Sequence, residues 1–132
     1  MAKYVYPAVF TPEENGMYSV NFPDLEGCYT GGEDLTEAII MAKDALALML
    51  FDYEIEKRPV PSPTPRNEVA VSGDEFVNMI VADTIDYQKK NNNKAIKKTL
   101  TIPEWLNEAA LSAGLNFSQV LQDAIKEQLH LL

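Results

Sequence analysis

Residues 96–120 read IKKTLTIPEWLNEAALSAGLNFSQV, and the folding of the C-terminal third of the chain follows from this stretch. In an extended chain Leu100 and Ile102 lie on one side. The residues that alternate with them are polar: Lys97, Thr99 and Thr101. Such alternation is typical of a strand with one buried face and one exposed face. The sequence therefore predicts a short strand over residues 96–102.

Two helix signals follow this strand. Pro103 suits the first turn of a helix, where its missing N–H is not needed, and Gly114 is a typical residue just after a helix end. Asn116 can then cap a second helix, and Gln119 can complete a capping box with it. The stretch therefore predicts the order strand, helix, helix.

A lone strand leaves its backbone N–H and C=O groups without partners. Antiparallel pairing with a second copy would satisfy these groups and would bring four helices around one apolar core. We therefore predict a homodimer. Its core is expected to contain Leu100, Ile102, Trp105, Leu106, Val120, Leu121 and Ile125.

The polar face of the paired strands predicts a DNA-binding surface. A two-stranded ribbon fits the major groove of double-stranded DNA, and the polar side chains of residues 97, 99 and 101 would face the base edges. The second helix would direct its free N–H groups at a phosphate, because the helix dipole favours an anion there. The residues at this helix start are Asn116, Phe117 and Ser118.

Residues 94–132 resemble the ribbon-helix-helix repressors. The resemblance is carried by residues 99–103, by Gly114 and by residues 116–120. Lys98 departs from it, because it lies on the inward side of the strand where such repressors often have an apolar residue. Its ammonium group is expected to extend to the edge of the core. An alternative is a helical hairpin that serves dimerisation only.

The N-terminal part of the chain predicts a second α+β domain. The expected strands span residues 4–11, 17–22, 28–30 and 75–82. Asn15 and Gly16 form a turn signal that predicts an antiparallel hairpin of the first two strands. The last strand is apolar on both faces, which predicts a more central position in the sheet.

A long helix is expected from Asp34 to about Glu56, with Asp34 and Glu37 as a capping box. One apolar face contains Leu35, Ile39, Ala42, Leu46, Met49 and Tyr53, and a second flank contains Ile40, Met41, Ala47, Leu48 and Phe51. This is more apolar surface than one sheet covers. Either a loop or another protein chain is expected to bury the rest.

Two polar or Pro-rich segments divide the chain. Pro59, Pro61, Pro63 and Pro65 predict a stiff crossover after the long helix. A polar segment over residues 83–94 predicts an interdomain linker. The expected division is an N-terminal domain over residues 1–87, a linker over 88–94 and a DNA-binding and dimerisation domain over 95–132.

The charge of the chain is distributed unevenly. The net charge is −9, of which residues 1–87 carry −11 and residues 88–132 carry +2. The N-terminal part therefore suits a basic partner, and the C-terminal part predicts a mildly basic surface that can approach phosphates.

Residues 20–28 read VNFPDLEGC, and together with the residues after them they resemble the HicB antitoxin family. The further matching residues are Thr30, Gly32, Asp34, Leu35, Glu37, Ala38, Ala42, Lys43 and Ala45. The resemblance implies a partial ribonuclease-H-like N-terminal fold and a C-terminal DNA-binding domain. It also implies a HicA-type toxin as partner, which is a small basic RNA-cleaving protein, and operator DNA upstream of a shared operon. We expect the toxin to bind the acidic loop at Asp24, Glu26, Glu33 and Asp34.

Other functional classes are less well supported by the residues. The carboxylates of the N-terminal part fall in loops, turns and strand ends, which does not suit two-metal catalysis, so no enzyme, metal or cofactor is expected. One cysteine and one histidine give no zinc pattern. No apolar run is long enough to span a bilayer, which predicts a cytoplasmic protein. The competing hypothesis is a repressor without a toxin partner that senses a small ligand beside the apolar helix.

Overall fold

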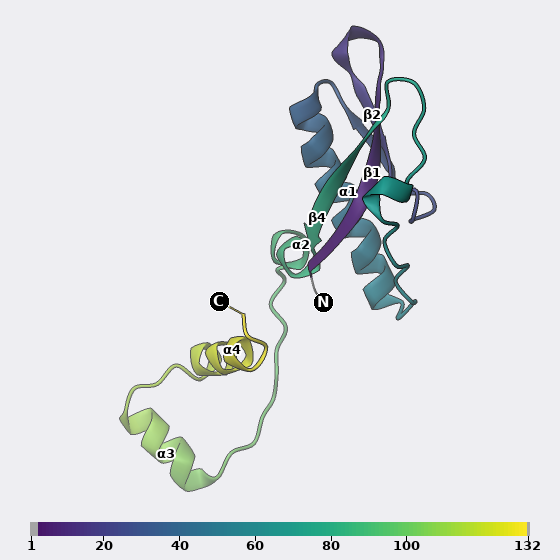
Figure 1. Cartoon of the computed structure of the whole chain (residues 1–132). Helices are drawn as coiled ribbons and strands as arrows, with labels where there is room; N and C mark the ends of the chain where they lie inside the picture. The colour runs from purple at the N-terminus through teal and green to yellow at the C-terminus, as the bar shows by residue number, and fades with distance from the viewer. Residues whose placement is uncertain (1–2, 132) are drawn as a thin grey trace. The chain divides into compact units, whose positions relative to one another are not determined.

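The computed structural model describes residues 3–131 and divides into two units after Lys94 (Figure 1). We call Met1–Lys94 the N-terminal unit and Ala95–Leu132 the C-terminal unit. The N-terminal unit contains a four-stranded antiparallel sheet and two α-helices, and the C-terminal unit contains two α-helices. The predicted α+β class is therefore confirmed.

The sheet has the strand order β3-β2-β1-β4, and all of its pairings are antiparallel. The strands are β1 (Lys3–Pro12), β2 (Tyr18–Asn21), β3 (Tyr29–Gly32) and β4 (Phe76–Asp83). The predicted hairpin of β1 and β2 is confirmed, with the 3-10 turn η1 (Glu14–Gly16) between the strands. Asn15 and Gly16 have positive φ angles of 62° and 78°, which these two residue types tolerate.

The prediction that the last strand is central is wrong, because β4 lies at the edge of the sheet. The apolar residues on the second face of β4 therefore need an explanation other than a central position. Val81 and Met79 on this face stand opposite Val5 and Pro7 of β1. Apolar cross-strand pairs stabilise an antiparallel sheet; on this face Pro7 is fully buried, whereas Val81 is 48% exposed.

Helix α1 (Leu35–Ile55) covers one face of the sheet (Figure 1). Its start is as predicted: the Asp34 carboxylate accepts a hydrogen bond of 2.8 Å from the Glu37 N–H. The Glu37 side chain reaches the Glu33 N–H at 3.4 Å, one residue earlier than expected. The buried face is also rotated from the predicted one, because small residues let the helix approach the sheet closely. The fully buried residues of α1 are Ala38, Ala42, Leu46 and Leu50.

These helix residues pack into the main core of the N-terminal unit. Their partners lie on the sheet and in the loop between β2 and β3. They are Tyr6, Ala8, Phe10, Val20, Phe22, Leu25, Cys28, Ile80 and Ala82. Phe10 also stacks on Phe76 with ring centroids 5.4 Å apart, which ties the central strand to the edge strand.

Gly32 sets how close α1 comes to β3. A Cβ atom at this position would lie 2.4 Å from the backbone nitrogen of Ala38. We expect Gly32→Ala to lower the free energy of unfolding by about 1–3 kcal/mol, because the first turn of the helix must move away. Urea denaturation of the full chain measures this loss. Gly73→Asn is the control, since nothing lies near Gly73 and Asn tolerates its positive φ; an equal loss in both variants would contradict the close approach.

The Pro-rich segment crosses from α1 to β4, as predicted, and includes the short 3-10 turn η2 (Arg66–Glu68). Two hydrogen bonds hold it to β1 and to the loop between β2 and β3. The Tyr6 hydroxyl donates to the Pro61 carbonyl, and the Thr64 N–H donates to the Asp24 carboxylate at 3.0 Å. The crossover is therefore part of the N-terminal unit.

The predicted linker is partly wrong, because residues within it form helix α2 (Thr84–Asn91). The Asp83 carboxylate caps this helix by accepting from the Ile85 and Asp86 N–H groups. Tyr87 packs against Phe51 of α1 with ring centroids 5.5 Å apart. The Thr84 hydroxyl also donates to the Glu54 carboxylate of α1, so α2 is joined to α1 and the N-terminal unit extends beyond residue 87.

The C-terminal unit contains α3 (Glu104–Ser112) and α4 (Phe117–Gln128). Gly114 follows α3 with a φ of 69°, which is the expected helix end. Residues 92–103 form no regular secondary structure, so the predicted strand over 96–102 is not formed within the single chain. Among the described residues no strand pairs with this segment. In the described part of the chain, no helix combines the length and apolar character needed to cross a membrane.

Candidate functional site

The predicted base-reading residues lie in the extended segment before α3. Lys97, Thr99 and Thr101 are all exposed, and none has a side-chain hydrogen bond or ion pair to another described residue. Pro103 closes this segment in an extended conformation, with φ −57° and ψ 143°. The three side chains are therefore available to an external partner.

The opposite side of the same segment contributes to an apolar groove. Leu100 and Ile102 line it together with Val120 and Leu121 of α4. The groove has a volume of about 480 Å³. Lys98 also lines it, on the inward side as the alternation predicts. The side chains that line this groove include four of the predicted dimer-core residues.

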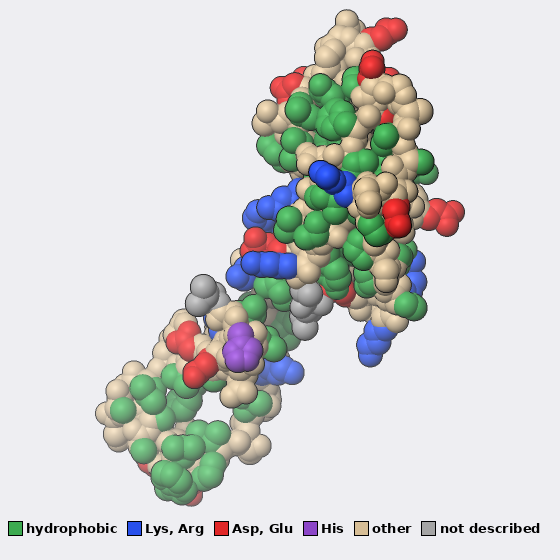
Figure 2. All heavy atoms as spheres, viewed as in Figure 1, with side chains coloured by type: hydrophobic (Ala, Val, Ile, Leu, Met, Phe, Trp, Pro, Cys, Tyr) green, Lys and Arg blue, Asp and Glu red, His purple; other side chains and the backbone are tan. Residues whose placement is uncertain are grey.

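The remaining predicted core residues are also accessible. Trp105 is 71% exposed, Leu106 is 41% exposed and Ile125 is 47% exposed. Among the described residues of the C-terminal unit, only Ala110 is buried. Figure 2 shows hydrophobic side chains on the surface of this unit. Large exposed apolar clusters are typical of a protein interface, so this unit has apolar surface available to a partner chain.

The start of α4 has the predicted capping arrangement. The Asn116 side chain accepts a hydrogen bond of 3.1 Å from the Gln119 N–H. The N–H groups of the first helical residues, Phe117 and Ser118, have no intrahelical acceptor at this end. They are the groups that can donate to a phosphate.

The predicted toxin surface is not one free acidic patch. The Asp24 carboxylate accepts from the N–H and the hydroxyl of Thr64, and the Asp34 carboxylate caps α1. Glu26 and Glu33 are exposed. Two of the four carboxylates therefore have structural partners, which sequence spacing alone does not reveal.

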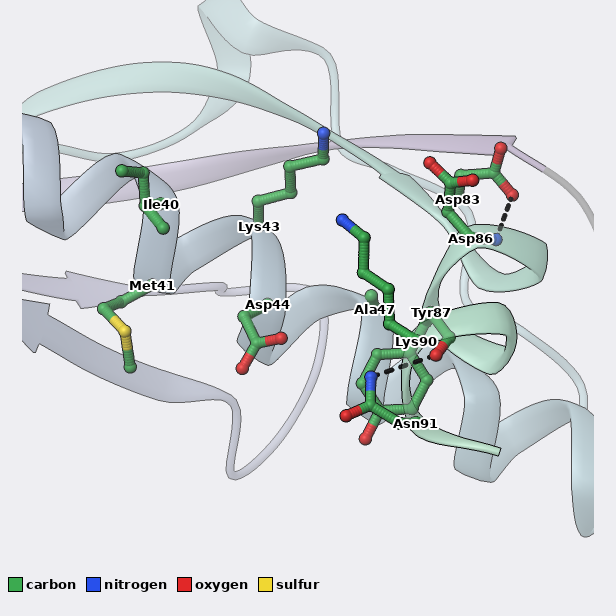
Figure 3. A pocket seen from close by; sticks show the side chains of 10 residues that line it. All are labelled: Ile40, Met41, Lys43, Asp44, Ala47, Asp83, Asp86, Tyr87, Lys90 and Asn91. Atoms are coloured by element: carbon green, nitrogen blue, oxygen red, sulfur yellow. Dashed lines mark hydrogen bonds between the residues drawn. The ribbon is translucent and has the colours of Figure 1, made fainter. Parts of the chain in front are cut away.

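A second groove, in the N-terminal unit, lies beside the apolar flank of the long helix, where the competing hypothesis places a small ligand. It has a volume of about 380 Å³ and lies between α1 and α2 (Figure 3). Ile40, Met41 and Ala47 supply apolar side chains, and Tyr87 stands on the α2 side. Lys43, Asp44, Asp83, Asp86 and Lys90 lie around it. The extra apolar flank of the long helix was the sequence signal for this surface.

A polar cluster joins three elements of the N-terminal unit. The Tyr4 hydroxyl of β1 and the Thr84 hydroxyl of α2 both donate to the Glu54 carboxylate of α1, at 2.8 and 3.1 Å. Burial and the neighbouring Glu54 carboxylate raise the pKa of Tyr4 to about 12. Thr84 is fully buried, so this cluster fixes the start of α2 to the sheet.

We expect Tyr4→Phe to lower the free energy of unfolding by about 1 kcal/mol at pH 8, through loss of the hydrogen bond to Glu54. A raised pKa in the folded state means that this contribution is complete below pH 10 and is lost as the pH rises towards 12. Denaturation of both proteins at several pH values measures the difference. A difference that stays constant from pH 8 to pH 12 would contradict the assignment.

The charges of the two units differ from the predicted division. Residues 1–94 carry eight Lys and Arg against sixteen Asp and Glu, a net −8, and residues 95–132 carry three against four, a net −1. The prediction of a mildly basic C-terminal part is therefore wrong at the structural boundary. Lys89 and Lys90 belong to the last turn of α2, where the helix dipole favours cations. Among the described residues, no group of His, Cys, Asp or Glu is placed to hold a metal ion.

Comparison with known proteins identifies relatives of both units. The family described as HicB_like antitoxin of bacterial toxin-antitoxin system matches residues 6–124. Antitoxin HicB of Escherichia coli (strain K12) is 41% identical over 73 residues, which are 54% of this chain and 49% of that protein. The chain thus spans about half the length of this curated relative.

Solved structures give the same result. A chain of the toxin-antitoxin complex from Streptococcus pneumoniae is 31% identical, with a TM-score of 0.62 over 96% of this chain and 99% of that one. A chain of the HicA3 and HicB3 toxin-antitoxin complex, 21% identical, has a similar fold, with a TM-score of 0.50 over 61% of this chain and 99% of that one. The chain therefore belongs to the HicB-like antitoxin family of bacterial toxin-antitoxin systems.

Proposed function

We propose that this chain is an antitoxin with two binding activities. Its N-terminal unit, for which we infer a partial ribonuclease-H-like fold, binds and neutralises a HicA-type mRNA-cleaving toxin. Its C-terminal unit pairs with a second copy as a ribbon-helix-helix dimer, which represses the operon by binding operator DNA. The observation that carries the DNA-binding part is that none of the seven predicted dimer-core residues is buried in the single chain.

The exposed apolar surface supplies the driving force for the dimer. Removing one large apolar side chain from water contributes about 1.5–3 kcal/mol. The groove beside α4 is apolar and open, so the same side chains of a second copy can enter it. Pairing of residues 96–102 with their copy would also satisfy the backbone groups that have no strand partner in one chain.

The paired strands would present Lys97, Thr99 and Thr101 twice, once from each chain. Lysine and threonine can donate hydrogen bonds to base edges, and the threonine methyl can contact thymine. The C-terminal unit has a net charge of −1, so few phosphate contacts are expected. Operator affinity should therefore fall only shallowly with salt compared with that of basic repressors.

The toxin-binding part is supported by family membership and by charge. Two of the similar solved structures are toxin-antitoxin complexes, one of HicA3 with HicB3. The N-terminal unit has a net charge of −8. An RNA-cleaving protein must attract a polyanion, so its active surface is expected to be basic and to suit an acidic partner. We infer that the antitoxin acts by binding, without catalysis, in the cytoplasm where mRNA and operator DNA are present.

Co-expression tests the toxin-binding part directly. When a HicA-type toxin from the same genome is induced from a foreign promoter, we expect this chain to restore growth and to co-purify with the toxin. The variant with Lys97, Thr99 and Thr101 replaced by alanine should restore growth equally, because these residues lie outside the N-terminal unit. Continued growth arrest in the presence of soluble antitoxin would contradict the proposal.

A further inference from the structure

The outward face of α1 carries a continuous stripe that no described part of the chain buries. Residues at intervals of three or four positions lie on one side of a helix. On α1 this side alternates acidic and apolar residues, all of them exposed. The stripe, which we call the α1 stripe, consists of Glu37, Met41, Asp44, Leu48, Asp52 and Ile55.

The other sides of α1 pack against other parts of the N-terminal unit. The opposite side of the helix packs on the sheet through Ala42 and Leu46. One flank faces α2, where Phe51 contacts Tyr87 and the Glu54 carboxylate accepts from Thr84. The groove shown in Figure 3 begins at this flank, and Met41 and Asp44 belong to both surfaces. Apart from Leu35 at the helix start, the exposed large apolar residues of α1 are therefore those of the stripe and the adjoining Ile40.

The side chains of the stripe are too exposed to serve the core. Ile55 is 62% exposed, Leu48 is 46% exposed and Met41 is 39% exposed. Leucine, isoleucine and methionine at such positions leave about half of their apolar surface in water, so they stabilise the unit less than buried residues do. Contiguous apolar residues with a polar surround are typical of protein interfaces.

The charges of the stripe indicate what kind of protein fits it. Three carboxylates alternate with the three apolar side chains, and Lys43 is the one basic residue among the exposed positions from 35 to 55. A complementary surface would have an apolar centre with lysine or arginine around it. A second copy of the N-terminal unit, with its net charge of −8, would be repelled.

We propose that the α1 stripe is the docking surface for the basic toxin, an inference that rests on the proposed function. It replaces the acidic loop at residues 24–34 as the expected contact. In that loop Asp24 and Asp34 already accept hydrogen bonds from Thr64 and Glu37. On the stripe the structure records no hydrogen bond or ion pair for the carboxylates of Asp44 and Asp52 with other described residues.

Cysteine labelling of the full chain tests this surface. The single native cysteine, Cys28, is buried, and burial raises its pKa to about 11, so its thiol reacts slowly at neutral pH. Leu48→Cys and Glu26→Cys each add one exposed thiol, on the α1 stripe and on the acidic loop. With saturating, catalytically inactive HicA-type toxin we expect iodoacetamide to label position 48 at least tenfold more slowly, with no change at position 26.

The outcomes separate this inference from the proposed function. If sedimentation shows bound toxin but position 48 is labelled at the free rate, the inference is overturned and the proposed function stands. Protection at position 26 alone would return the site to the acidic loop. Protection at position 48 without toxin, rising with antitoxin concentration, would assign the stripe to a second copy. If the wild-type chain binds no toxin, the proposed function fails and this inference fails with it.

A matched pair of substitutions gives a second readout. Leu48→Lys places a positive charge at the centre of the stripe, and we expect toxin affinity to fall at least 100-fold with an unchanged melting temperature. Val81→Lys is the control, because Val81 is 48% exposed, close to the 46% of Leu48, but lies on the sheet. Equal affinity of both variants for the toxin would overturn the inference.

Discussion

Replacing Lys97, Thr99 and Thr101 together with alanine is expected to reduce specific operator affinity at least 100-fold. The three side chains are exposed in the single chain and would face the base edges from both copies of the ribbon. Each good contact to a base contributes about 1–3 kcal/mol of discrimination. A gel shift with operator DNA and with a scrambled sequence measures this loss.

The dimer should survive this triple substitution, because none of the three residues belongs to the predicted apolar core. Sedimentation of the variant checks that point. Lys89→Ala with Lys90→Ala is the matched control, since it removes positive charge from α2 in the N-terminal unit. We expect this control to retain operator affinity within a few-fold. Dimer loss in the triple variant, or unchanged operator affinity, would mean that the opposite side of the strand faces the DNA.

Ile102→Asp is expected to raise the dimer dissociation constant at least 1000-fold and to abolish operator binding. Ile102 is 44% exposed in the single chain and lines the groove beside α4. An aspartate there leaves the folded units intact but would place a charge in the dimer core, which costs several kcal/mol. Sedimentation across a range of concentrations and the gel shift measure both effects.

Ile96→Asp is the control for this substitution, because Ile96 is 83% exposed and is not among the predicted core residues. Toxin binding should be unchanged in both variants. A dimer that withstands Ile102→Asp would place the interface elsewhere in the chain.

The structure also sets where the chain can be shortened. A chain that ends at Lys94 keeps α2 and its contacts with α1, whereas one that ends near residue 88 would cut through α2. We expect the shortened chain to bind toxin and to fail to bind operator. This expectation follows from the two-unit division and from the position of the predicted strand after residue 94.

Local signals in the sequence are sufficient to predict several elements of the fold. The Asn15-Gly16 turn predicted the β1–β2 hairpin, and Asp34 predicted the start of α1, because turn and cap geometry depend on a few neighbouring residues. The edge position of β4 could not be predicted in this way. Two apolar faces indicate burial on both sides, but in β4 the second face is matched by apolar residues of β1.

Long-range contacts explain the other differences. Helix α2 lies in a polar stretch. It is fixed by contacts with Phe51 and Glu54, which lie thirty or more residues before their partners Tyr87 and Thr84. The charge of the acidic loop predicts a contact surface, yet the Asp24 carboxylate accepts a hydrogen bond from Thr64, forty residues later. In the C-terminal unit the sequence predicted both helices and their caps. The strand and dimer core stay predictions, because their partners belong to a second chain.

Amide hydrogen exchange of residues 97–101 in the full-length protein tests the pairing of two C-terminal units most directly. These residues have no strand partner within one chain, so their amides can be protected only by pairing with a copy. We predict alternate strong protection along the segment, increasing with protein concentration in step with dimer formation by sedimentation. Fast exchange at every concentration, in a protein that sediments as a dimer, would show that the helices alone form the dimer and would contradict the ribbon.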